Sequence, residues 1–193
     1  MTGYDDKLLA QLEARVKAFT PDPKFADDRI IIITLTEAIA AASEGNFGVG
    51  AVLVRHGGEI VQTGHNRVFK PYFRSDLHAE MDVMTNFEQR FKDTELLTEF
   101  ILFSSLEPCP MCFTRLITSG VNKVYYAAVD DSGGMVSRTA NMPPIWHHLA
   151  QKRKFGSAEC STELREIALQ IFQSTTDRSD KTILKRAGVV PYS

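Results

Sequence analysis

The chain has 193 residues, 44% of them hydrophobic, and a formal net charge of -2. This length and apolar fraction suit one domain with a full hydrophobic core. The balanced charge argues against a general affinity for phosphate backbones, because nucleic-acid-binding domains usually carry a strongly basic face. The short basic group at Lys181, Lys185 and Arg186 is too sparse to form a basic stripe. Composition therefore favours a small substrate and makes a nucleic-acid partner unexpected.

Neither an anchor nor a leader is expected from the sequence. No apolar run approaches the roughly 18 residues that a membrane-spanning helix needs. The N-terminus carries acidic side chains at Asp5 and Asp6 and lacks the basic and apolar blocks of a signal peptide. Three cysteines, two of them in one short motif, do not form a disulfide framework. We therefore expect a cytoplasmic protein in a reducing compartment.

Two helices are predicted in the first quarter of the chain. Leu8, Leu12 and Val16 are spaced four residues apart, which indicates an amphipathic helix. Residues 28–44 contain both a β-branched run and a strongly helix-forming stretch. We interpret the whole segment as a helix that Gly45 ends.

Strands and helices then alternate. The predicted strands are residues 50–54, 59–63, 100–103 and 124–129, and the first two form a hairpin. Further helices are predicted to begin near Leu77, at Pro110, at Pro143 and Pro144, and after Ser161. The polar residues after Ser174 are expected to form an extended tail.

The alternation predicts an α/β fold in which helices pack on a mixed sheet. No internal repeat or linker is evident, so we expect a single domain over residues 1–193. Its core spans about residues 28–174, with an N-terminal helix and a C-terminal tail as extensions.

Two short motifs carry metal-binding chemistry. His78-Ala79-Glu80 lies where a loop enters a predicted helix, and Cys109-Pro110-Met111-Cys112 lies where a strand enters another. The two cysteines are three residues apart at a helix start and can hold one ion, and His78 supplies a third ligand. Two thiolates and one imidazole suit zinc.

The number of ligands indicates a catalytic role. Structural zinc sites usually have four protein ligands, whereas catalytic sites leave one position for water, whose pKa zinc lowers to about 7. Glu80, two residues after His78, is placed to move protons beside that position. A redox dithiol at Cys109 and Cys112, or a purely structural zinc site, is the alternative interpretation.

The order His-x-Glu followed by Pro-Cys-x-x-Cys is the signature of zinc deaminases. On these motifs, and on residues 50–54 and 64–67, the chain resembles the cytidine/deoxycytidylate deaminase superfamily from about residue 28 to about residue 131. It is most similar to the branch of tRNA adenosine, guanine and fungal cytosine deaminases. The resemblance implies a three-layer α-β-α sandwich with a five-stranded mixed sheet, and a homodimer or larger assembly.

The resemblance also implies roles for individual residues. His78, Cys109 and Cys112 match zinc ligands, and Glu80 matches the proton shuttle. The remaining matches are contacts to substrate: the side chain of Asn66, the backbone N–H of Ala79 and the apolar side chain of Phe47.

Residue chemistry leaves other roles open at three positions. Asn66 could instead cap a turn, and Phe47 could belong only to the core. Glu107 is expected to hold a backbone amide or an arginine rather than to take part in chemistry. The chain also departs from its relatives, which commonly have proline where Gly48 stands, and residues 130–134 are loosely similar to the tRNA-acting enzymes.

The sequence thus predicts a zinc-dependent hydrolytic deaminase of a free nucleobase, a nucleoside or a related amino-substituted heterocycle. A tRNA-specific adenosine deaminase is the alternative, and it would require a basic RNA-binding face. A catalytically silent, zinc-stabilised binding subunit is a more remote alternative. Glu80 argues against the silent subunit, because such a protein needs no proton shuttle.

Overall fold

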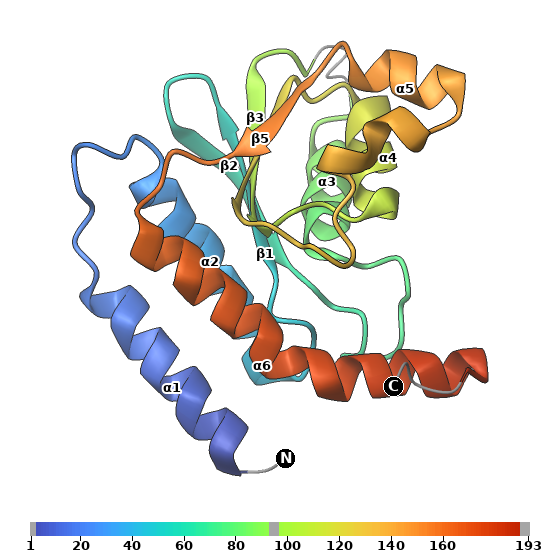
Figure 1. The fold of residues 1–193 in the computed structure, drawn as a ribbon. Helices are drawn as coiled ribbons and strands as arrows, with labels where there is room; N and C mark the ends of the chain where they lie inside the picture. The colour runs from blue at the N-terminus through green and yellow to red at the C-terminus, as the bar shows by residue number, and fades with distance from the viewer. Residues whose placement is uncertain (1–2, 93–96, 190–193) are drawn as a thin grey trace.

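A computed structural model describes residues 3–92 and 97–189, and a five-stranded sheet lies at its centre (Figure 1). The strands are β1 (Gly50–Arg55), β2 (Glu59–His65), β3 (Phe100–Leu106), β4 (Lys123–Ala128) and β5 (Lys154–Ser157). Their order is β2-β1-β3-β4-β5. β1 is antiparallel to β2 and β3, whereas β3, β4 and β5 run parallel. The predicted mixed sheet is confirmed.

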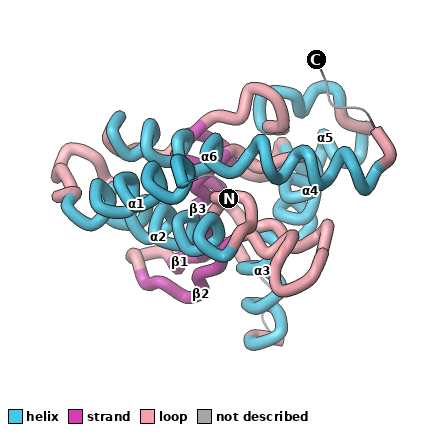
Figure 2. The backbone as a smooth tube through the Cα atoms, turned by 90° about the horizontal axis from the view of Figure 1, so that it is seen from below, coloured by secondary structure: helices cyan, strands magenta, loops and turns pink. Residues whose placement is uncertain are grey.

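Helices cover both faces of this sheet. α2 (Asp28–Glu44) and α6 (Thr162–Ala187) pack on one face, and α1 (Gly3–Ala18) lies beside both of them (Figure 2). α3 (Ala79–Arg90), α4 (Pro110–Ser119) and α5 (Pro144–Ala150) cover the other face, with the 3-10 helix η1 (Val136–Asn141) next to α5. The three-layer α-β-α sandwich is confirmed, and α1 forms an additional layer outside it.

The segment with mixed propensity is a helix, as expected, because its buried positions follow helical spacing. Ile31, Leu35 and Ile39 are buried against the sheet and α6. Burial of these side chains outweighs the small loss of helix propensity at β-branched residues. Gly45 ends the helix in the left-handed conformation, with φ of 96°, which glycine adopts without strain.

The extended tail expected after Ser174 is wrong, because α6 continues to Ala187. Its buried positions in this half include Thr175 and Ser179, which are polar. They continue the four-residue spacing of Ile171, but a hydroxyl gives no hydrophobic signal in the sequence. The Thr175 hydroxyl instead accepts a hydrogen bond from the backbone N–H of Gly48 at 2.9 Å, so this half of α6 is held against the loop before β1.

Two helices of the same layer are joined at their starts by a buried carboxylate. Asp28 is fully buried at the start of α2. Its oxygens accept hydrogen bonds from the backbone N–H of Ser161 at 2.7 Å and from the Ser161 hydroxyl at 2.6 Å. The start of α6 is therefore set by α2, far away in the sequence.

The strand β5 was not predicted from residue patterns, because it is only four residues long and follows a basic run. It pairs in parallel with β4 from Lys154 to Ser157 and completes the five strands that the resemblance implied. Within the described residues, no helix is both long and apolar enough to cross a membrane.

Candidate active site

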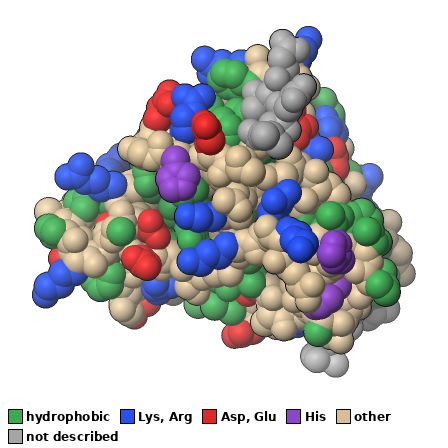
Figure 3. All heavy atoms as spheres, turned by 90° about the horizontal axis from the view of Figure 1, so that it is seen from above, with side chains coloured by type: hydrophobic (Ala, Val, Ile, Leu, Met, Phe, Trp, Pro, Cys, Tyr) green, Lys and Arg blue, Asp and Glu red, His purple; other side chains and the backbone are tan. Residues whose placement is uncertain are grey.

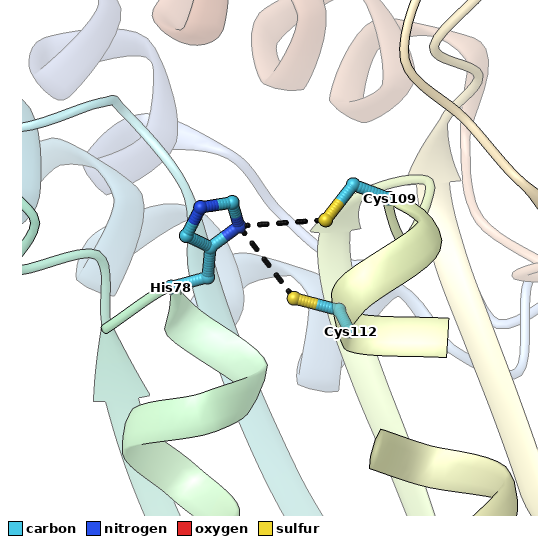
Figure 4. A group of neighbouring side chains, drawn as sticks. All are labelled: His78, Cys109 and Cys112. Carbon is cyan, nitrogen blue, oxygen red and sulfur yellow. Dashed lines mark hydrogen bonds between the residues drawn. The ribbon is translucent and has the colours of Figure 1, made fainter. Parts of the chain in front are cut away.

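Three side chains of kinds that can bind a metal converge where α3 and α4 begin (Figure 4). His78 immediately precedes α3 and Cys109 immediately precedes α4, both with extended backbone. Nδ1 of His78 lies 3.6 Å from Sγ of Cys109 and 3.6 Å from Sγ of Cys112. All three donor atoms lie within 4.8 Å of one another, so a single ion can contact them all.

The donor set fits zinc. One imidazole nitrogen and two sulfurs are ligands of the softness that zinc accepts in tetrahedral sites. Across residues 3–92 and 97–189, no fourth side chain of a kind that binds metals joins this group. Such a site keeps a coordination position for water, which is the arrangement of catalytic rather than structural zinc.

The two thiols hold their protons unequally. The hydrogen bond from Cys112 lowers the pKa of Cys109 to about 4. The same interaction, together with burial, raises the pKa of Cys112 well above its ordinary value. Both side chains lie at the start of α4, where unpaired N–H groups and the helix dipole favour negative charge. The surroundings therefore favour the thiolate form of Cys109.

Glu80 lies in the first turn of α3 and is only 3% exposed. The Ser104 hydroxyl of β3 donates a hydrogen bond to its Oε1 at 3.3 Å. Burial, and next the negative charge of Cys109, raise the pKa of the Glu80 carboxyl. A raised pKa makes a carboxyl a better proton acceptor when ionised, which favours general acid–base chemistry.

A cavity of about 240 Å³ opens beside these residues. His78, Glu80 and Cys109 lie on its lining. Its walls include apolar side chains from three separate parts of the chain: Phe47, Val49, Leu106 and Phe172. Its volume is smaller than that of typical pockets for drug-sized ligands, so it suits a single heterocyclic base.

Asn66 lines this cavity and also stabilises a turn. It is 2% exposed, and its Oδ1 accepts a hydrogen bond from the backbone N–H of Val68 at 3.1 Å. Because that oxygen must face the N–H, the orientation of the amide is determined. Its Nδ2 makes no hydrogen bond within the described part of the chain and can donate to a ligand. Turn capping and ligand contact are thus compatible.

Phe47 and Ala79 also lie where a ligand could meet them. The Phe47 ring lies on the cavity lining and stacks on Phe172 of α6 with centroids 6.2 Å apart. It packs against the main core as well, so wall and core roles coexist. Ala79 is the first residue of α3, and an N–H at that position has no acceptor within its own helix.

The carboxylate of Glu107 supports the loop after β4. Its oxygens accept hydrogen bonds from the backbone N–H groups of Asp130 and Val136, at 3.2 and 2.9 Å. Asp130 in turn accepts from the backbone N–H groups of Ser132 and Gly133. Glu107 therefore holds backbone amides, as expected.

Sequence reasoning missed the contribution of α6 to the cavity. Phe172, Thr176 and Asp180 lie on its lining and are spaced by four residues, so they share one face of α6. This spacing could have been noticed only if residues beyond Ser174 had been predicted to be helical. The cavity is therefore lined by residues as far apart in the sequence as Phe47 and Asp180, and α6 forms one of its walls.

Residues 26–128 match the family described as the cytidine and deoxycytidylate deaminase zinc-binding region. The match covers more than half of the chain and includes His78, Glu80, Cys109 and Cys112. The chain belongs to this family. It is a zinc-dependent deaminase, and the resemblance, the enzyme class and the zinc cofactor predicted from the sequence are confirmed.

Relatives of known function are similar over much of this deaminase. A tRNA-specific adenosine deaminase of Aquifex aeolicus is 32% identical over 136 residues, which cover 69% of this chain and 88% of the relative. A tRNA-specific adenosine deaminase of Bacillus subtilis is 37% identical over 108 residues, which cover 56% of this chain and 65% of the relative.

Solved structures show the same fold. One from a study of A-to-I editing by tRNA:A34 deaminases superposes with a TM-score of 0.63 at 26% identity, covering 74% of this chain and 98% of that one. The guanine deaminase of Nitrosomonas europaea superposes with a TM-score of 0.60 at 22% identity, covering 84% of this chain and 91% of its own. The latter likeness concerns the fold alone.

A partly buried ion pair positions the strand end that precedes Asn66 in this deaminase. His65 Nδ1 lies 2.7 Å from Oε2 of Glu37, and its Nε2 lies 3.2 Å from Oε2 of Glu44. The bond to Glu37 raises the pKa of His65, and the bond to His65 lowers the pKa of Glu37. The end of β2 is thus tied to α2 by charge as well as by packing.

The ion pair between His65 and Glu37 should make the free energy of unfolding depend on pH. The pKa of His65 is higher in the folded state than in the unfolded state. Its contribution to the free energy of unfolding is therefore complete below the unfolded-state pKa of about 6.5, and it is lost as the pH rises through the folded-state pKa. Glu37 is ionised in the same range because its pKa is lowered. We expect His65→Gln to reduce the free energy of unfolding in urea more at about pH 6 than at about pH 9. Comparing variant and wild type at each pH cancels the contribution of the metal site.

His56→Gln is the matched control, because His56 is exposed in the hairpin turn. Its effect should be small and independent of pH. A destabilisation by His65→Gln that stays constant or grows with pH would contradict the ion-pair assignment.

Proposed function

We propose that His78, Cys109 and Cys112 hold the zinc ion of this deaminase and that Glu80 moves the protons. The donor atoms within 4.8 Å of one another support the first assignment. The buried carboxyl of Glu80 beside them supports the second. Zinc held there supplies a Lewis acid that makes water a nucleophile at neutral pH.

The reaction places defined demands on Glu80. Water adds to the ring carbon that bears the amino group, the bond from that carbon to the amino nitrogen breaks, and ammonia leaves. The carboxylate of Glu80 accepts one proton from water and delivers it to the adjacent ring nitrogen, and it then carries the second to the departing amino group. Its raised pKa suits both directions of transfer.

Substrate is positioned by groups on the other walls of the cavity. The Nδ2 of Asn66 donates to an acceptor on the base, and the backbone N–H of Ala79 donates to a ring atom or carbonyl. The rings of Phe47 and Phe172 enclose the base and exclude water. Such a pocket recognises a base by its hydrogen-bonding edge and its flat faces, as deaminases of extruded bases do.

Adenosine in tRNA is the substrate that we propose. The observation that carries this proposal is the 32% identity to a tRNA-specific adenosine deaminase over 88% of that relative's length. It counts against the expectation, based on a net charge of -2, that a nucleic-acid partner is absent. A homodimeric state and a cytoplasmic location stay predictions.

A free base or nucleoside is the second candidate, and the acidic side chains at the cavity favour it. Asp130 and Asp180 both lie on the lining, and burial raises the pKa of Asp180. Carboxylates repel phosphate, and the long α6 covers one side of the cavity as a closed small-molecule site requires.

Glu80→Gln separates proton transfer from metal binding. Glutamine keeps the shape of the side chain but cannot accept a proton, so we expect kcat to fall by about 10²–10⁴-fold. Elemental analysis should still find about one zinc per chain. Glu166→Gln, at an exposed position of α6, is the control and should change neither quantity. Near-normal turnover in Glu80→Gln would contradict the shuttle and revive the silent-subunit interpretation.

Two substitutions at Asn66 separate substrate contact from turn capping. Asn66→Ser keeps a hydroxyl that can accept the Val68 N–H but loses Nδ2. We expect kcat/KM to fall by about tenfold, the value of one lost hydrogen bond, while the thermal midpoint stays near that of wild type. Asn66→Ala should lower both. Wild-type kcat/KM in Asn66→Ser would limit Asn66 to the turn.

The substrate is tested with matched RNA and small molecules. We expect conversion of adenosine to inosine in an anticodon stem-loop with adenosine at the wobble position, detected by mass spectrometry of nuclease digests. Free adenosine, adenine, guanine and cytosine should release little ammonia, because they lack the contacts that the rest of the RNA supplies. Efficient ammonia release from a free base with the stem-loop unchanged would favour the second candidate.

A further inference from the structure

A second hollow of about 660 Å³ lies between the C-terminal half of α6 and the connection from β2 to α3. In Figure 1 this connection descends from the sheet toward the end of α6. Five basic side chains line the hollow: Lys70, Arg178, Lys181, Lys185 and Arg186. We call this hollow the basic groove.

The charges of the basic groove are uncompensated. All five basic side chains are exposed, and none of them forms an ion pair with any described residue. Helical spacing produces most of the cluster, because Arg178, Lys181 and Lys185 follow one another at three- and four-residue intervals. The prediction that the basic residues near the C-terminus are too sparse is therefore wrong, since it assumed an extended tail.

Aromatic rings connect the basic groove to the active-site cavity. Phe69 and Phe73 line the groove, with their ring centroids 6.0 Å apart. Phe69 also contacts Phe47, which lines the cavity, at 5.5 Å. At the far end, the guanidinium of Arg186 lies over the ring of Phe73 at 3.7 Å. The exposed ring of Tyr72, in the same connection, is 64% accessible.

The opposite side of the cavity is acidic. Asp130, Asp131 and Asp177 line a neighbouring hollow formed by the loop after β4 and another face of α6. These charges repel phosphate, whereas the basic groove attracts it. The surroundings of the cavity thus differ in charge from one side to the other. Figure 3 shows a different face, seen from above, on which side chains of both signs are mixed.

We propose that the basic groove binds the phosphate backbone of the RNA strand that carries the target nucleotide into the cavity. The inference rests on the proposed tRNA substrate and specifies where that substrate lies. Single-stranded nucleic acid is bound by positively charged grooves with aromatic side chains on which bases stack. The groove combines both features, and the acidic side limits the approach of the strand to this direction.

Counterion release provides a direct measure of these contacts. For single strands, the slope of log K against log salt concentration is about -0.7 for each phosphate neutralised. Fluorescence anisotropy with a labelled anticodon stem-loop carrying inosine at the wobble position avoids turnover, because inosine is already deaminated. We expect Lys181→Ala/Lys185→Ala to weaken binding and to reduce the magnitude of the slope by about 1.4.

Lys24→Ala/Lys152→Ala is the matched control. Both lysines are exposed, remote from the groove in sequence, and outside the ion pairs of the described chain. This double variant changes net charge equally and should leave the slope near that of wild type. Thermal unfolding and zinc content of both double variants verify that the fold and the metal site are intact.

The outcomes separate the groove from the substrate. If the salt-dependence slope becomes smaller only in Lys181→Ala/Lys185→Ala, the basic groove binds the RNA strand. If wild-type protein nevertheless leaves the adenosine stem-loop unchanged, the proposed tRNA substrate is wrong and the groove still stands. Equal slopes in both double variants and wild type, with the adenosine stem-loop still deaminated, overturn the groove and leave the proposed function standing. Binding of a double-stranded RNA or of anionic vesicles, with no binding of the labelled stem-loop, would overturn it as well.

Discussion

The convergence of His78, Cys109 and Cys112 requires the N-termini of two helices to meet above one edge of the sheet. β2 is antiparallel to β1, and β1 is antiparallel to β3, so β2 and β3 end at the same edge. α3 and α4 begin beyond these two ends and pack on the same face of the sheet. Because a metal ion tolerates little error in ligand position, the strand order and the starts of both helices are coupled to the site. Their dipoles also direct positive potential toward the anionic ligands.

α6 extends this architecture across the site. Its approach to the loop before β1 leaves no space at Gly48, where an added Cβ would lie 2.7 Å from both a side-chain carbon and the backbone oxygen of Ile171. The Gly48 N–H also donates to Thr175, which a proline could not do. The departure from the proline common in relatives therefore accompanies the long α6. The same helix supplies Phe172, Thr176 and Asp180 to the cavity.

Charged side chains form local clusters of one sign, which the net charge of -2 does not reveal. Buried carboxylates are satisfied by specific partners, as Asp28 is by Ser161 and Glu107 by backbone amides. Near the cavity, Asp177 of α6 lines the acidic hollow, whereas Arg178 and Lys181 of the same helix line the basic groove. A global balance cannot report such an arrangement, because electrostatic attraction depends on which charges lie within about one Debye length of a ligand.

Local sequence determined the candidate metal ligands, the proton-shuttle candidate and most elements of the sandwich. His78, Glu80, Cys109 and Cys112 could be recognised because their spacing and chemistry lie within short segments, and the helices up to α5 because their buried positions are apolar. Only the tertiary structure decided the length of α6, the short strand β5 and the basic groove. Each depends on contacts between segments distant in sequence, and the buried hydroxyls of Thr175 and Ser179 carry no hydrophobic pattern. Periodicity detects burial of apolar groups against a core, whereas the burial of Thr175 is accompanied by a hydrogen bond from the distant Gly48 N–H, which no local pattern reports.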